Sequence, residues 1–119
     1  MGLISYSEAI DYTLLNQYRD MLGTDGISQS LQTLETLIPS YLSELAALGE
    51  AEDEPAFRRQ AHKVKGACRS LGFARLGDAM QYLEREHWTW ADANAVQTEC
   101  HAWLKADLDE VKRWLSTAT

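Results

Sequence analysis

A single histidine, His62, lies in a segment whose charge is opposite to that of the whole chain. The 119 residues carry a formal net charge of −7, whereas the segment from Arg58 to Arg69 holds five basic residues besides His62 and no acidic residue. A neutral imidazole is a nucleophile and a general base, and neighbouring cations disfavour its protonation. The same cations stabilise negative charge that is transferred to the ring. This combination favours reaction of His62 with an anionic group, above all a phosphoryl group.

The spacing of apolar residues predicts that this segment is an amphipathic helix with His62 on its exposed side. At about 100° per residue, His62 points about 140° away from the apolar side of the helix, and Gly66 about 180° away. The apolar side consists of Phe57, Ala61, Val64, Cys68 and Leu71. Glycine within a helix costs about 1 kcal/mol relative to alanine, and nothing in the apolar pattern requires it here. Its missing side chain would leave one flank of the imidazole open to a reacting protein.

The whole chain predicts helices and no strands, because apolar residues recur at spacings of three and four and only two prolines are present. The expected helices are a short one between Asp11 and Gly23, a longer one ending at Gly49, a third from Asp53 to about Leu71, a fourth around Leu76 to Leu83, and a last one starting near Asp92. Short connections imply antiparallel neighbours. The predicted fold is therefore all-α: an antiparallel up-and-down four-helix bundle with a short N-terminal covering helix.

Finer details of this fold are also predicted. The chain is expected to form a single domain over residues 1–119, with an irregular N-terminal segment at 1–10. The short helix is expected to pack through one apolar face made of Leu14, Tyr18, Met21 and Leu22. Pro39 lies inside the longer helix and predicts a local bend there. Cys68 and Cys100 fall at apolar positions, which indicates small buried side chains in a reducing compartment; the sequence leaves a disulfide between them open.

The segment around His62 resembles the motif of the histidine phosphotransfer (HPt) domain family. That motif is a histidine, any residue, an aliphatic residue, a lysine and a glycine, followed by a later glycine and leucine. Here it corresponds to the run Ala61, His62, Lys63, Val64, Lys65 and Gly66, with Gly72 and Leu76 at the matching offsets. A further pattern, made of Trp88, Trp90, Trp103, Asp107 and Trp114, resembles the C-terminal HPt domain of Arc-type (anaerobic redox control) hybrid sensor histidine kinases.

The resemblance implies a role for each motif residue. His62 would be the phosphoacceptor, taking a phosphoryl group from a receiver-domain aspartate and passing it to another receiver aspartate in a multistep two-component phosphorelay. Lys65 would stabilise the phosphoryl group, and Gly66 would give steric access. The surrounding basic residues, Arg58, Arg59, Lys63 and Arg69, are assigned to partner binding. Many family members have a small residue at the offset of Arg69, so Arg69 is interpreted as a partner-selecting contact.

The expected partners are response-regulator receiver domains, together with the remainder of a hybrid sensor kinase if the chain is part of one. We expect no cofactor on this domain. Magnesium is expected on the partner receiver, because the basic surface around His62 offers no carboxylate cluster. The chain lacks a glycine-rich loop that could hold ATP, so it is expected to be a phosphocarrier module rather than an enzyme.

Composition sets the expected location and excludes some partners. The acidic balance argues against nucleic acid, which needs a clustered positive surface. No apolar run approaches the length of a membrane span, and no basic-then-apolar segment opens the chain. A cytoplasmic location without direct membrane contact is expected, including the case of the cytoplasmic end of a membrane-bound sensor kinase. The sequence leaves open whether the domain is free-standing or part of such a kinase.

Three other functions compete with phosphotransfer for these residues. A helical adaptor could bind receiver or kinase domains without accepting phosphate. A hydrolase would need a nucleophile or carboxylate matched to His62 on the same face, and none is evident in the sequence. A metal site is disfavoured because the histidines and cysteines lack ligand spacing: they are His62, His87, His101, Cys68 and Cys100.

Overall fold

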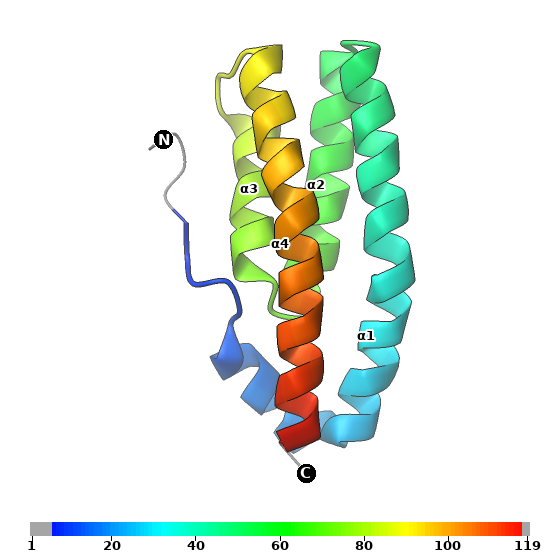
Figure 1. Ribbon diagram of the computed structural model, residues 1–119, viewed down its shortest axis with the longest axis vertical. Helices are drawn as coiled ribbons and strands as arrows, with labels where there is room; N and C mark the ends of the chain where they lie inside the picture. Colours follow the sequence, from blue (N-terminus) through cyan, green and yellow to red (C-terminus); the bar gives the residue numbers. More distant parts are fainter. Residues whose placement is uncertain (1–5, 118–119) are drawn as a thin grey trace.

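The four helices run alternately up and down, as Figure 1 shows for the computed structural model, which describes residues 6–117. They are α1 (Tyr12–Glu50), α2 (Glu54–Ser70), α3 (Ala74–Arg85) and α4 (Trp90–Thr117). The prediction of an all-α, antiparallel up-and-down four-helix bundle is confirmed. The proposed domain limits at 1 and 119 lie outside the described residues and stay a prediction. Within residues 6–117, no helix combines the length and apolar content that a membrane crossing requires.

The helix α1 consists of two helical segments that meet at Gly23. This glycine has φ 72° and ψ 172°, a left-handed backbone conformation that side-chain-bearing residues rarely adopt. The first segment packs across the end of the bundle, beside the turn between α2 and α3 (Figure 1). There the backbone N–H of Asp11 donates to the carbonyl oxygen of Gly72 at 2.8 Å. The short covering helix closed by Gly23 is therefore confirmed.

The apolar face predicted for this covering segment is wrong in part: Tyr18 packs against the core as predicted, but Met21 and Leu22 do not belong to the buried face. Leu15 is completely buried, whereas Met21 is 75% exposed and Leu22 is 55% exposed. The reason is a contact with the α2–α3 turn, where a Cβ built at Gly72 would lie 3.4 Å from Cγ of Leu15. Periodicity finds several similar faces on so short a helix, and the contact with the turn selects one. Within α1, only Gly23 has non-helical backbone angles, and the helix continues through Pro39.

The ends of α2 are set by the residues that the sequence indicated. The carboxylate of Asp53 accepts a hydrogen bond from the backbone N–H of Ala56 at 3.2 Å, which caps the start of the helix. Gly72 follows the other end with φ 81°. A Cβ there would lie 3.1 Å from the carbonyl oxygen of Asp11, so glycine satisfies both the turn and the close approach of the N-terminal segment.

The start of α4 differs from the prediction by two residues. The backbone N–H of Asp92 donates to the hydroxyl of Thr89 at 3.1 Å, and the backbone N–H of Thr89 donates to the carboxylate of Asp92 at 3.2 Å. This reciprocal pair is a capping box, in which Thr89 caps the helix and Asp92 lies in its first turn.

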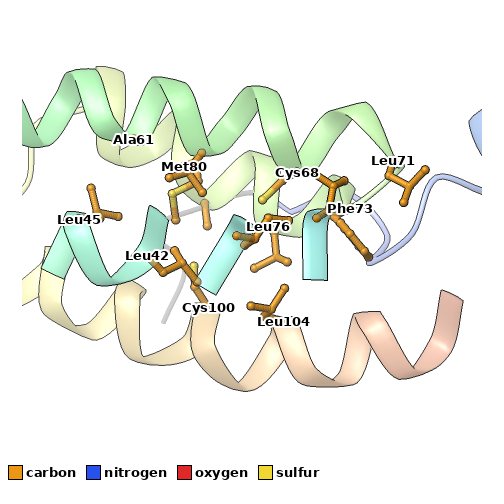
Figure 2. Packing of buried hydrophobic residues seen from close by; sticks show 14 of the residues in the cluster. Leu42, Leu45, Ala61, Cys68, Leu71, Phe73, Leu76, Met80, Cys100 and Leu104 are labelled. Carbon is orange, nitrogen blue, oxygen red and sulfur yellow. The ribbon is translucent and has the colours of Figure 1, made fainter. Parts of the chain in front are cut away.

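The core is formed by the apolar stripes of all four helices, as Figure 2 shows in close-up. Each residue of the apolar side predicted for α2 is at most 2% exposed.

Cys68 and Cys100 are free and buried. Burial raises the pKa of the Cys68 thiol to about 12, so this residue behaves as a small apolar side chain. Trp88 and Trp90 pack edge-on against Phe57, with ring centroids 5.3 and 5.2 Å away.

Candidate functional site

His62 projects from the middle of α2 into solvent, and its side chain is 63% exposed. By contrast, the nearby residues Ala61 and Val64 point into the core and are completely buried. The orientation therefore follows the helical pattern, as predicted. An imidazole in this position is accessible to a second protein.

The ring of His62 is held by a carboxylate from the neighbouring helix. Nδ1 of His62 lies 2.9 Å from Oε2 of Glu84, which belongs to the last turn of α3. Nζ of Lys65 lies 2.6 Å from the other carboxylate oxygen, Oε1. Both the Glu84 and the Lys65 side chains are largely buried, with 15% and 12% of their surface exposed. One carboxylate therefore holds the imidazole and the lysine predicted to act with it.

The charge of Glu84 determines which nitrogen of His62 carries the proton. Burial acts to raise the pKa of Glu84, but its hydrogen bonds with Lys65 and His62 and the positive charge of Lys65 outweigh it and lower that pKa below its ordinary value. An ionised carboxylate can only accept hydrogen bonds, so Nδ1 must be the donor. In the neutral ring this assignment leaves Nε2 with a free electron pair, on the side of the ring away from Glu84.

Glu84 is the site residue that sequence reasoning missed, and it corrects the predicted electrostatics. The ring is contacted by an acidic group, and is not surrounded by cations alone. Glu84 lies outside the basic segment, so a search along α2 could not find it. The register of the α2–α3 hairpin does indicate that Glu84 lies beside His62, because His62 is ten residues before Gly72 and Glu84 is twelve residues after it. In an antiparallel pair, residues at similar distances from the turn face each other.

Gly66 lies one turn beyond His62 on the exposed surface. A Cβ built at this position would meet no atom within 4 Å, counting the described part of the chain. Packing inside the bundle therefore does not require glycine here. The space above position 66 remains open to an approaching partner.

Arg58, assigned from the sequence to partner binding, is directed toward α3. Its Nη1 donates to the carbonyl oxygens of Leu83 at 3.2 Å and Glu84 at 2.9 Å, and its Nη2 donates to that of Glu86 at 3.0 Å. Its Nε donates to the carboxylate of Glu54 at 3.0 Å. The guanidinium thus binds the C-terminal end of α3.

The other predicted partner contacts lie on the exposed surface of α2. Arg59, Lys63 and Arg69 are all exposed. Nζ of Lys63 lies 4.4 Å from the ring centroid of Tyr41. Arg69 pairs with Asp78 at 3.4 Å, so part of its charge is directed toward α3. These three residues border the surface that contains His62 and Gly66.

The described residues provide no group of three or more histidine, cysteine or acidic side chains able to hold a metal ion. The carboxylate closest to His62 is already engaged by the imidazole and by Lys65.

Fold and site together define a class of protein: a helical bundle that presents an accessible, carboxylate-held histidine on a helix surface. The chain belongs to the Hpt domain family, whose sequence model matches residues 27–114. This span includes α2 and α3, and hence His62, Lys65, Gly66 and Glu84.

Individual relatives agree with this family. The chain is 29% identical to the aerobic respiration control sensor protein ArcB of Escherichia coli K12 over 97% of its own length, but it spans only 15% of ArcB. It is also 29% identical, over 70% of its length, to the sensor histidine kinase AruS of Pseudomonas aeruginosa and covers 8% of that protein. The fold matches the histidine-containing phosphotransfer domain of ArcB from Escherichia coli with a TM-score of 0.85 and 27% identity, covering 93% of this chain and 96% of that domain.

Proposed function

We propose that this chain is a histidine phosphotransfer module that accepts a phosphoryl group on Nε2 of His62 from a receiver-domain aspartate and passes it to another receiver aspartate. The observation that carries the proposal is the hydrogen bond between His62 and Glu84. It holds an exposed imidazole in one orientation and directs the unprotonated nitrogen outward. Family membership and the match to the phosphotransfer domain of ArcB support it.

The transfer balances without a cofactor on this chain. The electron pair of Nε2 attacks the phosphorus of the aspartyl phosphate, an N–P bond forms, and the P–O bond to the aspartate breaks. The aspartate leaves as a carboxylate, and the proton on Nδ1 stays in its hydrogen bond to Glu84. Transfer to the next receiver is the reverse of these steps. In this proposal Lys65 stabilises the phosphoryl oxygens, as the family motif implies; in the unphosphorylated chain its ammonium group is paired with Oε1 of Glu84 at 2.6 Å.

The surroundings of His62 suit a receiver domain as partner. The open space at Gly66 admits another protein close to the imidazole, and Arg59, Lys63 and Arg69 offer positive charge beside it. An acidic receiver active site that carries its own magnesium ion would complement this surface. We place the module in the cytoplasm, either alone or as part of a hybrid sensor kinase.

A transfer assay tests the proposal. The domain is incubated with a phosphorylated receiver and Mg²⁺, and the label that it acquires is treated with acid and with base. A phosphorus–nitrogen bond should be lost in acid and retained in base, whereas a phosphoserine or phosphothreonine ester would survive the acid. If several receivers form complexes with the domain but never label it, the chain is a helical adaptor and the proposal is wrong.

Gly66→Leu should slow transfer by about a hundredfold, because a side chain at this position would obstruct the partner and displace the reacting groups by about 1 Å. Helix formation should not suffer, since leucine has the higher helix propensity by somewhat less than 1 kcal/mol. Stopped-flow or rapid-quench labelling measures the rate, and thermal unfolding followed by circular dichroism measures stability. Transfer at the normal rate in this variant would contradict the access role of Gly66.

A further inference from the structure

The C-terminal end of α3 depends on a side chain from α2. The last carbonyl groups of a helix have no partners within it, and a helix end without partners frays. Here the carbonyl oxygens of Leu83, Glu84 and Glu86 all accept hydrogen bonds from Arg58. Nε1 of Trp88 adds a second bond to Leu83 at 3.0 Å. Arg58 therefore supplies most of the side-chain hydrogen bonds described at this end of the helix.

Arg58 and His62 bind the same residue from two sides. They lie one turn apart on α2, and Arg58 donates to the main-chain oxygen of Glu84 while Nδ1 of His62 contacts its carboxylate. Both contacts are 2.9 Å long. Arg58 thus holds the main chain of the residue whose carboxylate contacts the imidazole.

The guanidinium of Arg58 is itself firmly held. Its Nε is bound by Glu54, and its Cζ lies 4.5 Å from the ring centroid of Trp88. Only 23% of the Arg58 side chain is exposed. A planar group with several donors in a fixed arrangement can reach three carbonyl oxygens at once, which a lysine ammonium group on a flexible stem cannot do equally well.

We propose that Arg58 is a positioning residue for phosphotransfer: by holding the end of α3, it fixes the carboxylate of Glu84 that orients His62. The inference rests on the proposed function for its kinetic consequence, but not for its structural one. Arg58 acts through Glu84 and touches neither the phosphoryl group nor the receiver. This role replaces the partner contact that the sequence suggested for Arg58.

The first test needs no receiver. In Arg58→Gln, nitrogen NMR of the imidazole should show that His62 loses its preference for a proton on Nδ1, because Glu84 no longer stays beside it. Arg58→Lys should show the same change although it keeps the positive charge. Arg59→Gln removes the same charge from the adjacent, exposed position and should leave the protonation pattern of the His62 ring unchanged. An unaltered imidazole in both Arg58 variants would overturn the proposal, whether or not the domain transfers phosphate.

The second test separates positioning from docking. In Arg58→Gln the rate constant at saturating phosphorylated receiver should fall about tenfold, while the half-saturating receiver concentration stays within about twofold. In a Glu84→Ala background the same substitution should have no further effect, since the residue through which it acts is gone. Circular dichroism at the assay temperature confirms that each variant is folded. A raised half-saturating concentration with an unchanged rate constant, or a full effect in the Glu84→Ala background, would show that Arg58 contacts the receiver and would refute the positioning role.

Discussion

Replacing His62 by glutamine should abolish phosphotransfer, lowering the rate by at least about a thousandfold, because it removes the proposed nucleophile. The glutamine amide can still donate a hydrogen bond to Glu84, but it has no nitrogen with a free electron pair. Since the His62 side chain is 63% exposed, the free energy of unfolding should change by no more than about 0.5 kcal/mol. Labelling by a phosphorylated receiver measures the first effect, and urea unfolding measures the second.

His101→Gln is the matched control for this experiment. His101 is also an exposed histidine on a helix, but it lies on α4, away from the α2–α3 pair that carries Glu84. This variant should accept phosphate at the normal rate. Undiminished labelling of the His62→Gln variant would show that the phosphoacceptor lies elsewhere. Loss of labelling in both variants would point to a general effect of histidine replacement.

The orientation of His62 and Gly66 could be predicted from the sequence because both depend on the geometry of a single helix. The buried and exposed positions of α2 follow from the helical period and from the core residues around it. Neither prediction requires knowledge of the neighbouring helix. The helix ends marked by Asp53 and Gly72 are predictable for the same reason, since capping is a local interaction.

The partners of the reactive residues were not predicted from local patterns, because they come from a second helix and finding them requires its register. Glu84 becomes a site residue only when the α2–α3 hairpin is in register, and nothing in its local sequence marks it. Similarly, the sequence shows that Arg58 is positive but not whether its guanidinium faces solvent or the carbonyl groups of another helix. The error at Leu15 has the same origin, because the contact with Gly72 selects the buried face of the covering segment.

A buried ion pair between α3 and α4 carries the largest expected effect on stability. Asp107 is only 2% exposed, and its Oδ1 accepts a hydrogen bond from Nη2 of Arg75 at 3.0 Å. The guanidinium of Arg75 also lies 4.5 Å from the ring centroid of Trp103. Burial raises the pKa of Asp107 above its ordinary value, and the charge and hydrogen bond of Arg75 only partly offset this. The ionised form of Asp107 is therefore tolerated because Arg75 is present.

Arg75→Met should lower the free energy of unfolding by about 3 kcal/mol near neutral pH, because it leaves a buried carboxylate without its cation. Arg59→Met, the same substitution at an exposed position, should have an effect of at most about 0.5 kcal/mol. Urea unfolding of the two variants and the parent chain measures both changes. Equal stabilities of the Arg75→Met variant and the parent chain would mean that the pair does not contribute to holding α3 against α4.

The loss in free energy of unfolding caused by Arg75→Met should become smaller as the pH falls, and this pH dependence identifies the cause of the loss. A carboxyl group whose pKa is raised by folding binds more protons in the folded than in the unfolded state, so its contribution to stability falls as pH rises between the two pKa values. Loss of Arg75 raises the folded pKa of Asp107 further, since Arg75 is the group that lowers it. The variant should therefore recover part of its lost stability, relative to the parent chain, once the pH is low enough to protonate Asp107. Adding Asp107→Asn should restore stability at neutral pH, whereas a deficit that is the same at every pH would assign the loss to packing against Trp103.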